Sequence, residues 1–180
     1  IPLTFCINRC IKEGCFPSAL KTSKVLPLYK NNCEHSCNNY RPISQLSSLS
    51  KIFEKAIFAQ ASEFLNSNNI THELQFGFRP NHSCSHAVLK TVCELEAAKN
   101  KNLFTILVSI DLRKAFDTVN VSEILPAKLK HYFGNEKTCN FLSSFFTDRQ
   151  QFVKINDAQS SVVNTYDIGV IQGSSLGPPC

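Results

Sequence analysis

The chain has 180 residues, of which 43% are hydrophobic and 18% charged, and this composition excludes an intrinsically disordered or fibrous protein. Its longest nearly apolar stretch, residues 103–110, is too short to cross a bilayer, and the first residues lack the basic and then apolar pattern of a signal peptide. Because the chain begins with Ile1 and contains no methionine, we expect it to be part of a longer translation product.

Basic residues are concentrated in the first third of the chain. The sequence holds 19 lysines and arginines against 14 acidic residues, a formal net charge of +5, and residues 1–60 hold eight basic and three acidic residues. A basic segment beside a neutral remainder favours a polyanionic partner, such as a nucleic acid or a triphosphate. A basic surface that is solvated and has no partner is the alternative interpretation.

The nine cysteines are an odd number, so a complete set of disulfides would leave one thiol over. We expect reduced thiols, as is usual in an intracellular protein. A Cys-Glu-His-Ser-Cys motif offers Cys33, His35 and Cys37 as zinc ligands, and Cys84 and His86 are the nearest further donors. A small zinc-binding interaction domain is therefore one hypothesis for this sequence.

Two amphipathic helices are predicted in the first hundred residues. Apolar residues recur at helical spacing over positions 46–65, where Ser44, Ser47 or Ser48 caps the start and the Asn-rich segment 66–69 ends the helix. A second helix is expected to follow Ser83. Its apolar face is formed by Ala87, Val88, Thr91, Val92, Leu95 and Ala98.

Residues 103–110 form a continuous apolar run with β-branched members, which is typical of a buried strand. Asp111 follows directly. A carboxylate held at the end of a buried strand suits a hard cation such as Mg²⁺ that is bound together with phosphate. The alternative is an Asp that only caps the next turn, as Asp117 is expected to do six residues later.

The remainder of the chain mixes helices with strands. Asn120 or Ser122 begins a further helix, with Pro126 in its first turn, where a missing N–H is tolerated. Another helix contains Phe141, Leu142, Phe145 and Phe146. Residues 151–155 and 160–164 are expected to pair as a hairpin around Asn156-Asp157. Helices first, then strands mixed with helices, predict an α+β fold.

Several further positions carry candidate binding residues. Lys30 and Arg41 are cations of the basic third that could grip a triphosphate. Arg79 lies in a Gln-Phe-Gly-Phe-Arg-Pro turn and could contact nucleic acid, or could be a solvated residue on a packed turn. The Gln172-Gly173 turn could bring an amide side chain close to a ligand, because glycine allows close approach.

In their order along the chain, these segments resemble the reverse transcriptase domain of non-LTR (LINE-type) retrotransposons. The resemblance covers nearly the whole chain. It is carried by Phe16-Pro17 and by residues 21–30, 39–44, 49–55, 75–80, 111–119 and 169–178. It implies a right-hand polymerase fold, with residues 1–100 as a partial fingers domain and residues 101–180 as a partial palm. This sequence has Ile171 where family members usually have proline.

The resemblance also implies roles for single residues. Asp111 matches the first metal-binding aspartate, to which Leu112 adds its backbone carbonyl. Nucleotide binding is implied for Lys30, Arg41, Lys114, Ala115, Phe116, Gln172 and Gly173, with Phe116 at the steric-gate position beneath the sugar. Arg79 and Asp117 match positions that contact the template or support the fold.

The implied reaction is RNA-directed DNA synthesis. A primer 3′-hydroxyl attacks the α-phosphate of a deoxynucleotide, and two Mg²⁺ or Mn²⁺ ions hold the attacking and leaving oxygens. The implied partners are an RNA template, a DNA primer and deoxynucleoside triphosphates, inside the cell in nucleus and cytoplasm, with no membrane. The family's second acidic motif would follow Cys180, so we expect the isolated chain to be inactive. A nucleic-acid-binding remnant that has lost catalysis is the alternative.

Overall fold

The computed structural model describes residues 2–31, 33–112, 114–165 and 169–176. The chain divides into two compact units. The first unit combines residues 1–60 with residues 114–180, and the second consists of residues 61–113. Among the described residues, no helix has both the length and the apolar character that crossing a membrane requires.

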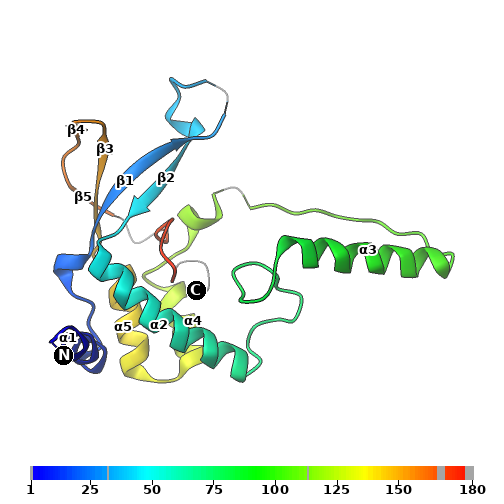
Figure 1. Cartoon of the computed structure of the whole chain (residues 1–180), viewed down its shortest axis with the longest axis horizontal. Helices are drawn as coiled ribbons and strands as arrows, with labels where there is room; N and C mark the ends of the chain where they lie inside the picture. The colour runs from blue at the N-terminus through cyan, green and yellow to red at the C-terminus, as the bar shows by residue number, and fades with distance from the viewer. Residues whose placement is uncertain (1, 32, 113, 166–168, 177–180) are drawn as a thin grey trace. The chain divides into compact units, whose positions relative to one another are not determined.

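A small mixed sheet organises the first unit (Figure 1). Its strands are β1 (Thr22–Tyr29), β2 (Tyr40–Gln45), β3 (Gln150–Ile155), β4 (Ala158–Gln159) and β5 (Val163–Asn164). The path through the sheet is β2-β1-β3-β4, and β5 also pairs with β3. The β1–β2 pair is antiparallel, whereas β1 and β3 run parallel from Thr22 opposite Gln150 to Val25 opposite Val153. The sheet thus joins segments that lie more than a hundred residues apart in the sequence.

Alternation of side chains along β1 decides which face of the sheet is covered. Ser23 and Val25 are buried, whereas the last residues of β1 are exposed. Pro27 lies opposite Pro42 in the β1–β2 register. Pairs alternate between hydrogen-bonded and non-bonded along an antiparallel ladder, and the N–H of Ser44, two residues after Pro42, points away from β1 to the carbonyl of Gln172. The two prolines therefore face each other at a non-bonded pair, where the missing N–H groups remove no hydrogen bond between β1 and β2.

Helices surround one hydrophobic core in this unit. They are α1 (Pro2–Glu13), the first turns of α2 (Ser48–Ser67), α4 (Ile124–Phe133) and α5 (Glu136–Phe146). The buried core residues are Ile7, Phe16, Phe53, Ile57, Val121, Leu125, Leu129, Cys139, Phe141, Leu142, Phe145, Phe146, Val170 and Leu176. The core therefore draws on α1, α2, α4 and α5 as well as on the segment that follows β5.

The helices predicted in this unit are present, and α1 is a further helix that the sequence analysis did not predict. The start of α4 differs from the prediction, because Glu123 precedes it without a side-chain cap, and Asn120 accepts from the N–H of Glu123 in the turn before it. Ser47 accepts a hydrogen bond from the N–H of Ser50 and begins α2. Pro126 lies in the first turn of α4, as expected. Helix α5 ends at Phe146, and the hairpin of β3 turns at Asn156, whose φ is 50°.

The second unit is built differently. Helix α3 (Cys84–Asn100) begins where the sequence predicted, with Ser83 accepting a hydrogen bond from the N–H of His86, but none of its residues is buried. The predicted buried strand over residues 103–110 is wrong, because this segment is extended, exposed and in no sheet. A strand needs a partner that takes up its N–H and C=O groups. None of the described strands pairs with this segment.

Candidate functional site

Two segments that carry site candidates meet in the first unit. The N–H of Val170 donates to the carbonyl of Phe116 at 2.8 Å, and the N–H of Gly169 donates to the carbonyl of Val119 at 2.7 Å. These bonds place the 3-10 helix η3 (Ala115–Thr118) beside the segment that leads into Gln172. Residues about fifty positions apart in the sequence are thereby joined by backbone hydrogen bonds.

The Gln172-Gly173 turn is fixed against β2. The N–H of Ser44 donates to the carbonyl of Gln172 at 2.8 Å. Gly173 has a φ of +116°, and a Cβ atom at this position would lie 2.8 Å from the carbonyl oxygen of Ser44. Only glycine fits such a backbone without displacement. The glycine here allows close approach of the β2 backbone, whereas the expected close approach of a ligand stays a prediction.

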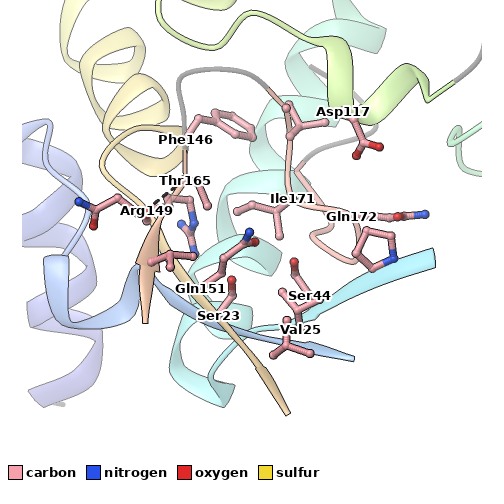
Figure 2. A pocket seen from close by; sticks show the side chains of 16 residues that line it. Ser23, Val25, Ser44, Asp117, Phe146, Arg149, Gln151, Thr165, Ile171 and Gln172 are labelled. Carbon is pink, nitrogen blue, oxygen red and sulfur yellow. Dashed lines mark hydrogen bonds between the residues drawn. The ribbon is translucent and has the colours of Figure 1, made fainter. Parts of the chain in front are cut away.

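A cavity of about 550 Å³ opens next to this turn. Figure 2 shows Asp117 and Gln172 on one side of it and Arg149 and Thr165 on the other, with Ser44 of β2 also in its lining. The remaining lining residues are Ser23, Val25, Pro42, Phe146, Gln151, Val153, Val163, Asn164, Gly169, Val170 and Ile171. Small-molecule sites commonly have volumes of roughly 300–1,000 Å³ and mix apolar walls with a few polar groups. The volume of this cavity falls within that range, and its walls mix apolar and polar residues.

The β1–β2 hairpin carries two of the candidate cations. Leu28 lies opposite Arg41 in the register, and the N–H of Lys30 donates to the carbonyl of Asn39 at 2.8 Å. Side chains alternate along a strand, and residues directly opposite each other share a face. Lys30 and Arg41 therefore lie on the same face of the hairpin, and both are exposed.

The remaining candidates of the first unit surround η3. Lys114 has left-handed backbone geometry with a φ of 57° and immediately precedes η3. Phe116 is half-buried and packs against the hydrophobic core, whereas Lys114, Ala115 and Asp117 are exposed. The structure thus brings Phe116, Asp117 and Gln172 to one place in the fold.

Three candidates belong to the second unit. Asp111 and Leu112 are exposed at the end of the extended segment that follows α3. Arg79 is half-buried and donates from Nη1 to the carbonyl of His72 at 3.3 Å, which closes the Gln-Phe-Gly-Phe-Arg-Pro turn. Arg79 therefore has a structural contact within its own loop.

The zinc motif does not gather into a site. Cys33 and Cys37 are exposed free thiols in the loop between β1 and β2. Within the described ranges, no group of three His, Cys, Asp or Glu side chains is arranged to hold a metal ion, and this includes Cys33, His35 and Cys37.

Arg149 is a buried cation on the wall of the cavity. It is 2% exposed, donates from Nη1 to the carbonyl of Phe145 at 2.8 Å, and lies over the rings of Phe16 and Phe145 at 5.9 and 5.0 Å from their centroids. Its Nε and Nη2 are the buried side-chain donors of the described residues that have no hydrogen-bond partner. Burial lowers the pKa of Arg149 to about 10, and the charge of Glu54 acts in the opposite direction.

The stability of the chain relative to an Arg149→Met variant is expected to rise at high pH. The pKa of Arg149 is about 10 in the folded chain and keeps its ordinary, higher value in the unfolded chain. Between these values the unfolded chain binds more protons, so the free energy of unfolding rises with pH by roughly 1 kcal/mol between about pH 9 and pH 11. Urea unfolding of both proteins at each pH measures the difference between their free energies of unfolding. The contributions of the other titrating groups cancel in this difference. A difference that does not change with pH would mean that burial does not lower the pKa of Arg149 in the folded chain.

Sequence reasoning missed two buried charged residues at the site, Glu54 and Arg149. The signal for Glu54 was present, because it lies on the helical face of α2 that also carries Ser50, Phe53 and Ile57, all of which are buried. A carboxylate on an otherwise inward face indicates a polar partner in the core. Arg149 offers no such periodic signal, because it lies between α5 and β3.

The chain is similar to known proteins over almost its whole length. Residues 28–179 match the family model described as reverse transcriptase (RNA-dependent DNA polymerase). Three Drosophila melanogaster proteins align with 98% of the chain. They are the probable RNA-directed DNA polymerases from transposon BS and transposon X-element, at 32% and 31% identity, and the RNA-directed DNA polymerase from mobile element jockey, at 30%. The chain spans 19% of the length of each of these relatives.

Proposed function

The chain belongs to the reverse transcriptase family, and from this membership we propose that it forms the nucleotide-binding part of an RNA-directed DNA polymerase. The observation that supports this function best is that Asp117 and Gln172, from different family motifs, line one cavity, while the N–H of Val170 donates to the carbonyl of Phe116 beside it. In the intact protein the domain would add deoxynucleotides to a primer 3′-hydroxyl on an RNA template.

We propose that residues 1–100 belong to the fingers and residues 101–180 to the palm of a right-hand polymerase. The β1–β2 hairpin is then part of the fingers, and its cationic face binds the triphosphate through Lys30 and Arg41. The shared face of these two exposed side chains supports this assignment. The planar guanidinium of Arg can donate two parallel hydrogen bonds to phosphate oxygens, and the ammonium of Lys adds a compact positive charge.

Phe116 and the Gln172-Gly173 turn are proposed to surround the sugar and base of the incoming nucleotide. The ring of Phe116 is held by the hydrophobic core, which would let it act as a rigid barrier to a 2′-hydroxyl. The backbone amides of Lys114 and Ala115 are assigned to the phosphates, and Asp117 and Arg79 to support of the fold or contact with the template.

Asp111 is proposed as the metal-binding aspartate, with the carbonyl of Leu112 as a further oxygen ligand. Carboxylate and carbonyl oxygens are the ligands that Mg²⁺ and Mn²⁺ prefer, so the ligand atoms of these two residues suit such ions. When bound, two such ions would offset the charge that develops on the reacting phosphate. The chain's own contribution is to bind and orient the triphosphate. Partners of the intact protein are proposed to be the RNA template and DNA primer, inside the cell in nucleus and cytoplasm.

Replacing Asp111 by asparagine in the full-length protein is expected to reduce primer extension on an RNA template by at least roughly a hundredfold, because the negative charge that attracts the ions is lost while the shape is kept. Binding of primer and template without divalent ions should stay within about twofold of the wild type. The matched control is Asp157→Asn, which changes an exposed Asp in the turn of the β3 hairpin.

Full activity of the Asp111→Asn protein would contradict the proposed catalytic role. A full-length wild type that binds nucleic acid without extending a primer would favour the non-catalytic remnant instead. The isolated 180-residue chain is proposed to be inactive in the same assay, since Asp111 is the one residue in it that matches the family's metal-binding carboxylates.

A further inference from the structure

We propose that Glu54, a buried residue of α2, is a positioning residue that holds the Gln172-Gly173 turn in its binding conformation. This inference rests on the proposed role of that turn in nucleotide binding. It concerns a residue to which neither the resemblance nor the family match gives a role.

Glu54 reaches the turn directly. It is 2% exposed, and its Oε2 accepts hydrogen bonds from the hydroxyl of Ser174 at 2.9 Å and from the N–H of Ser175 at 2.8 Å. Its other oxygen, Oε1, accepts a longer bond from the hydroxyl of Ser50 at 3.4 Å. The Ser174 hydroxyl in turn accepts from the N–H of Leu176 at 3.1 Å. One carboxylate therefore organises three consecutive residues that directly follow Gly173.

The turn is held from both sides. On one side, the carbonyl of Gln172 accepts from the N–H of Ser44 on β2. On the other side, the carboxylate of Glu54 accepts from Ser174 and Ser175. Gly173 lies between these two anchors and has no room for a side chain. Because both flanks of Gly173 are anchored and Gly173 has no room for a side chain, the backbone of the turn, including the Gln172 carbonyl, is held in one conformation beside the cavity.

The chemistry of Glu54 indicates that this hold is strong. A carboxylate is costly to bury unless hydrogen bonds replace its water. Hydrogen bonds to an ionised acceptor are roughly twice as strong as neutral ones. The negative charge also favours the charged form of Arg149, a cavity-lining residue. An apolar residue at position 54 would fill the core without providing either interaction.

The test compares variants of the full-length polymerase. Glu54→Ala should raise the KM for deoxynucleotides by roughly tenfold or more while changing kcat less, since it releases the turn and leaves the metal-binding Asp111 untouched. Glu54→Gln should restore most of the affinity, because its carbonyl oxygen can still accept from Ser174 and Ser175. The control is Glu63→Gln, an exposed Glu on the same helix, which should leave the KM within about twofold.

Hydrogen exchange gives a readout that does not depend on catalysis. In a peptide covering residues 169–176, Glu54→Ala should speed exchange of the Ser175 amide, and Ser174→Ala should do so to a smaller extent. Ser174→Ala leaves the buried carboxylate in place and serves if Glu54→Ala fails to fold. Unchanged exchange in both variants, or an unchanged KM in folded Glu54→Ala, would overturn the inference.

A Gln172→Ala variant separates this inference from the function on which it rests. If Gln172→Ala weakens nucleotide binding and Glu54→Ala does not, Glu54 has no positioning role. If Gln172→Ala has no effect on nucleotide binding, the proposed role of the turn is wrong, and the exchange of residues 169–176 alone decides whether Glu54 holds it.

Discussion

Replacing Phe16 by alanine is expected to lower the free energy of unfolding by about 3–5 kcal/mol. Phe16 is 1% exposed, and its ring packs edge-on against Phe53, Phe141 and Phe145, with centroids 5.5, 6.0 and 4.9 Å apart. Truncation removes the ring from the centre of the core and leaves a cavity between α2 and α5. It also removes one of the two rings that contact the Arg149 guanidinium.

The matched control is Phe5→Ala. Phe5 lies on α1 and is 66% exposed, so its truncation should change the free energy of unfolding by no more than about 0.5 kcal/mol. Urea unfolding followed by circular dichroism measures both variants. Equal effects of the two substitutions would show that Phe16 does not occupy the core position described above.

Local signals in the sequence predicted α2, α3, α4 and α5, but not α1. Helix α2 shows a long apolar repeat and a serine cap at Ser47, and α3 begins at the predicted Ser83 cap. A helix satisfies its hydrogen bonds within its own segment, so its boundaries depend mainly on residues close in the sequence. The turn of the β3 hairpin at Asn156 is local in the same sense.

Strands were less predictable, because they depend on partners that lie far away. The apolar run at residues 103–110 has the composition of a strand, yet no described strand pairs with it. Conversely, β1 and β2 gave no clear signal, since each contains a proline, which usually argues against a strand. The register makes these prolines acceptable by placing Pro27 opposite Pro42.

In the candidate site, too, the residues in local motifs could be predicted and those that depend on long-range contacts could not. Family motifs identified Phe116 and Gln172, and the structure bonds the carbonyl of Phe116 to the N–H of Val170, two residues before Gln172. Glu54 carried a weak signal on a helix face, and Arg149 carried none. Their roles arise from tertiary contacts: Glu54 binds a turn 120 residues away, and Arg149 lies over an aromatic ring from the N-terminal segment. Periodicity within one element cannot reveal such contacts.

Replacing Gly173 by alanine is expected to destabilise the chain by about 3 kcal/mol and to weaken nucleotide binding at least tenfold if the proposed function is correct. Two effects add. The φ of +116° is strained for any residue with a Cβ atom, and that atom would lie 2.8 Å from the carbonyl oxygen of Ser44. Because the clash is with backbone of β2, relief requires the turn to move, which breaks the bond between the Ser44 N–H and the Gln172 carbonyl.

Two other glycines separate these effects. Gly134 ends α4 with a φ of +64° and has open space around it, so Gly134→Ala tests backbone strain alone and should cost about 1 kcal/mol. Gly77 has open space and no positive φ, so Gly77→Ala should be nearly neutral. The loss in free energy of unfolding should therefore be smallest for Gly77→Ala, larger for Gly134→Ala and largest for Gly173→Ala. If Gly173→Ala costs no more than Gly134→Ala, the close approach of the turn to β2 is absent, and with it the anchor that opposes Glu54.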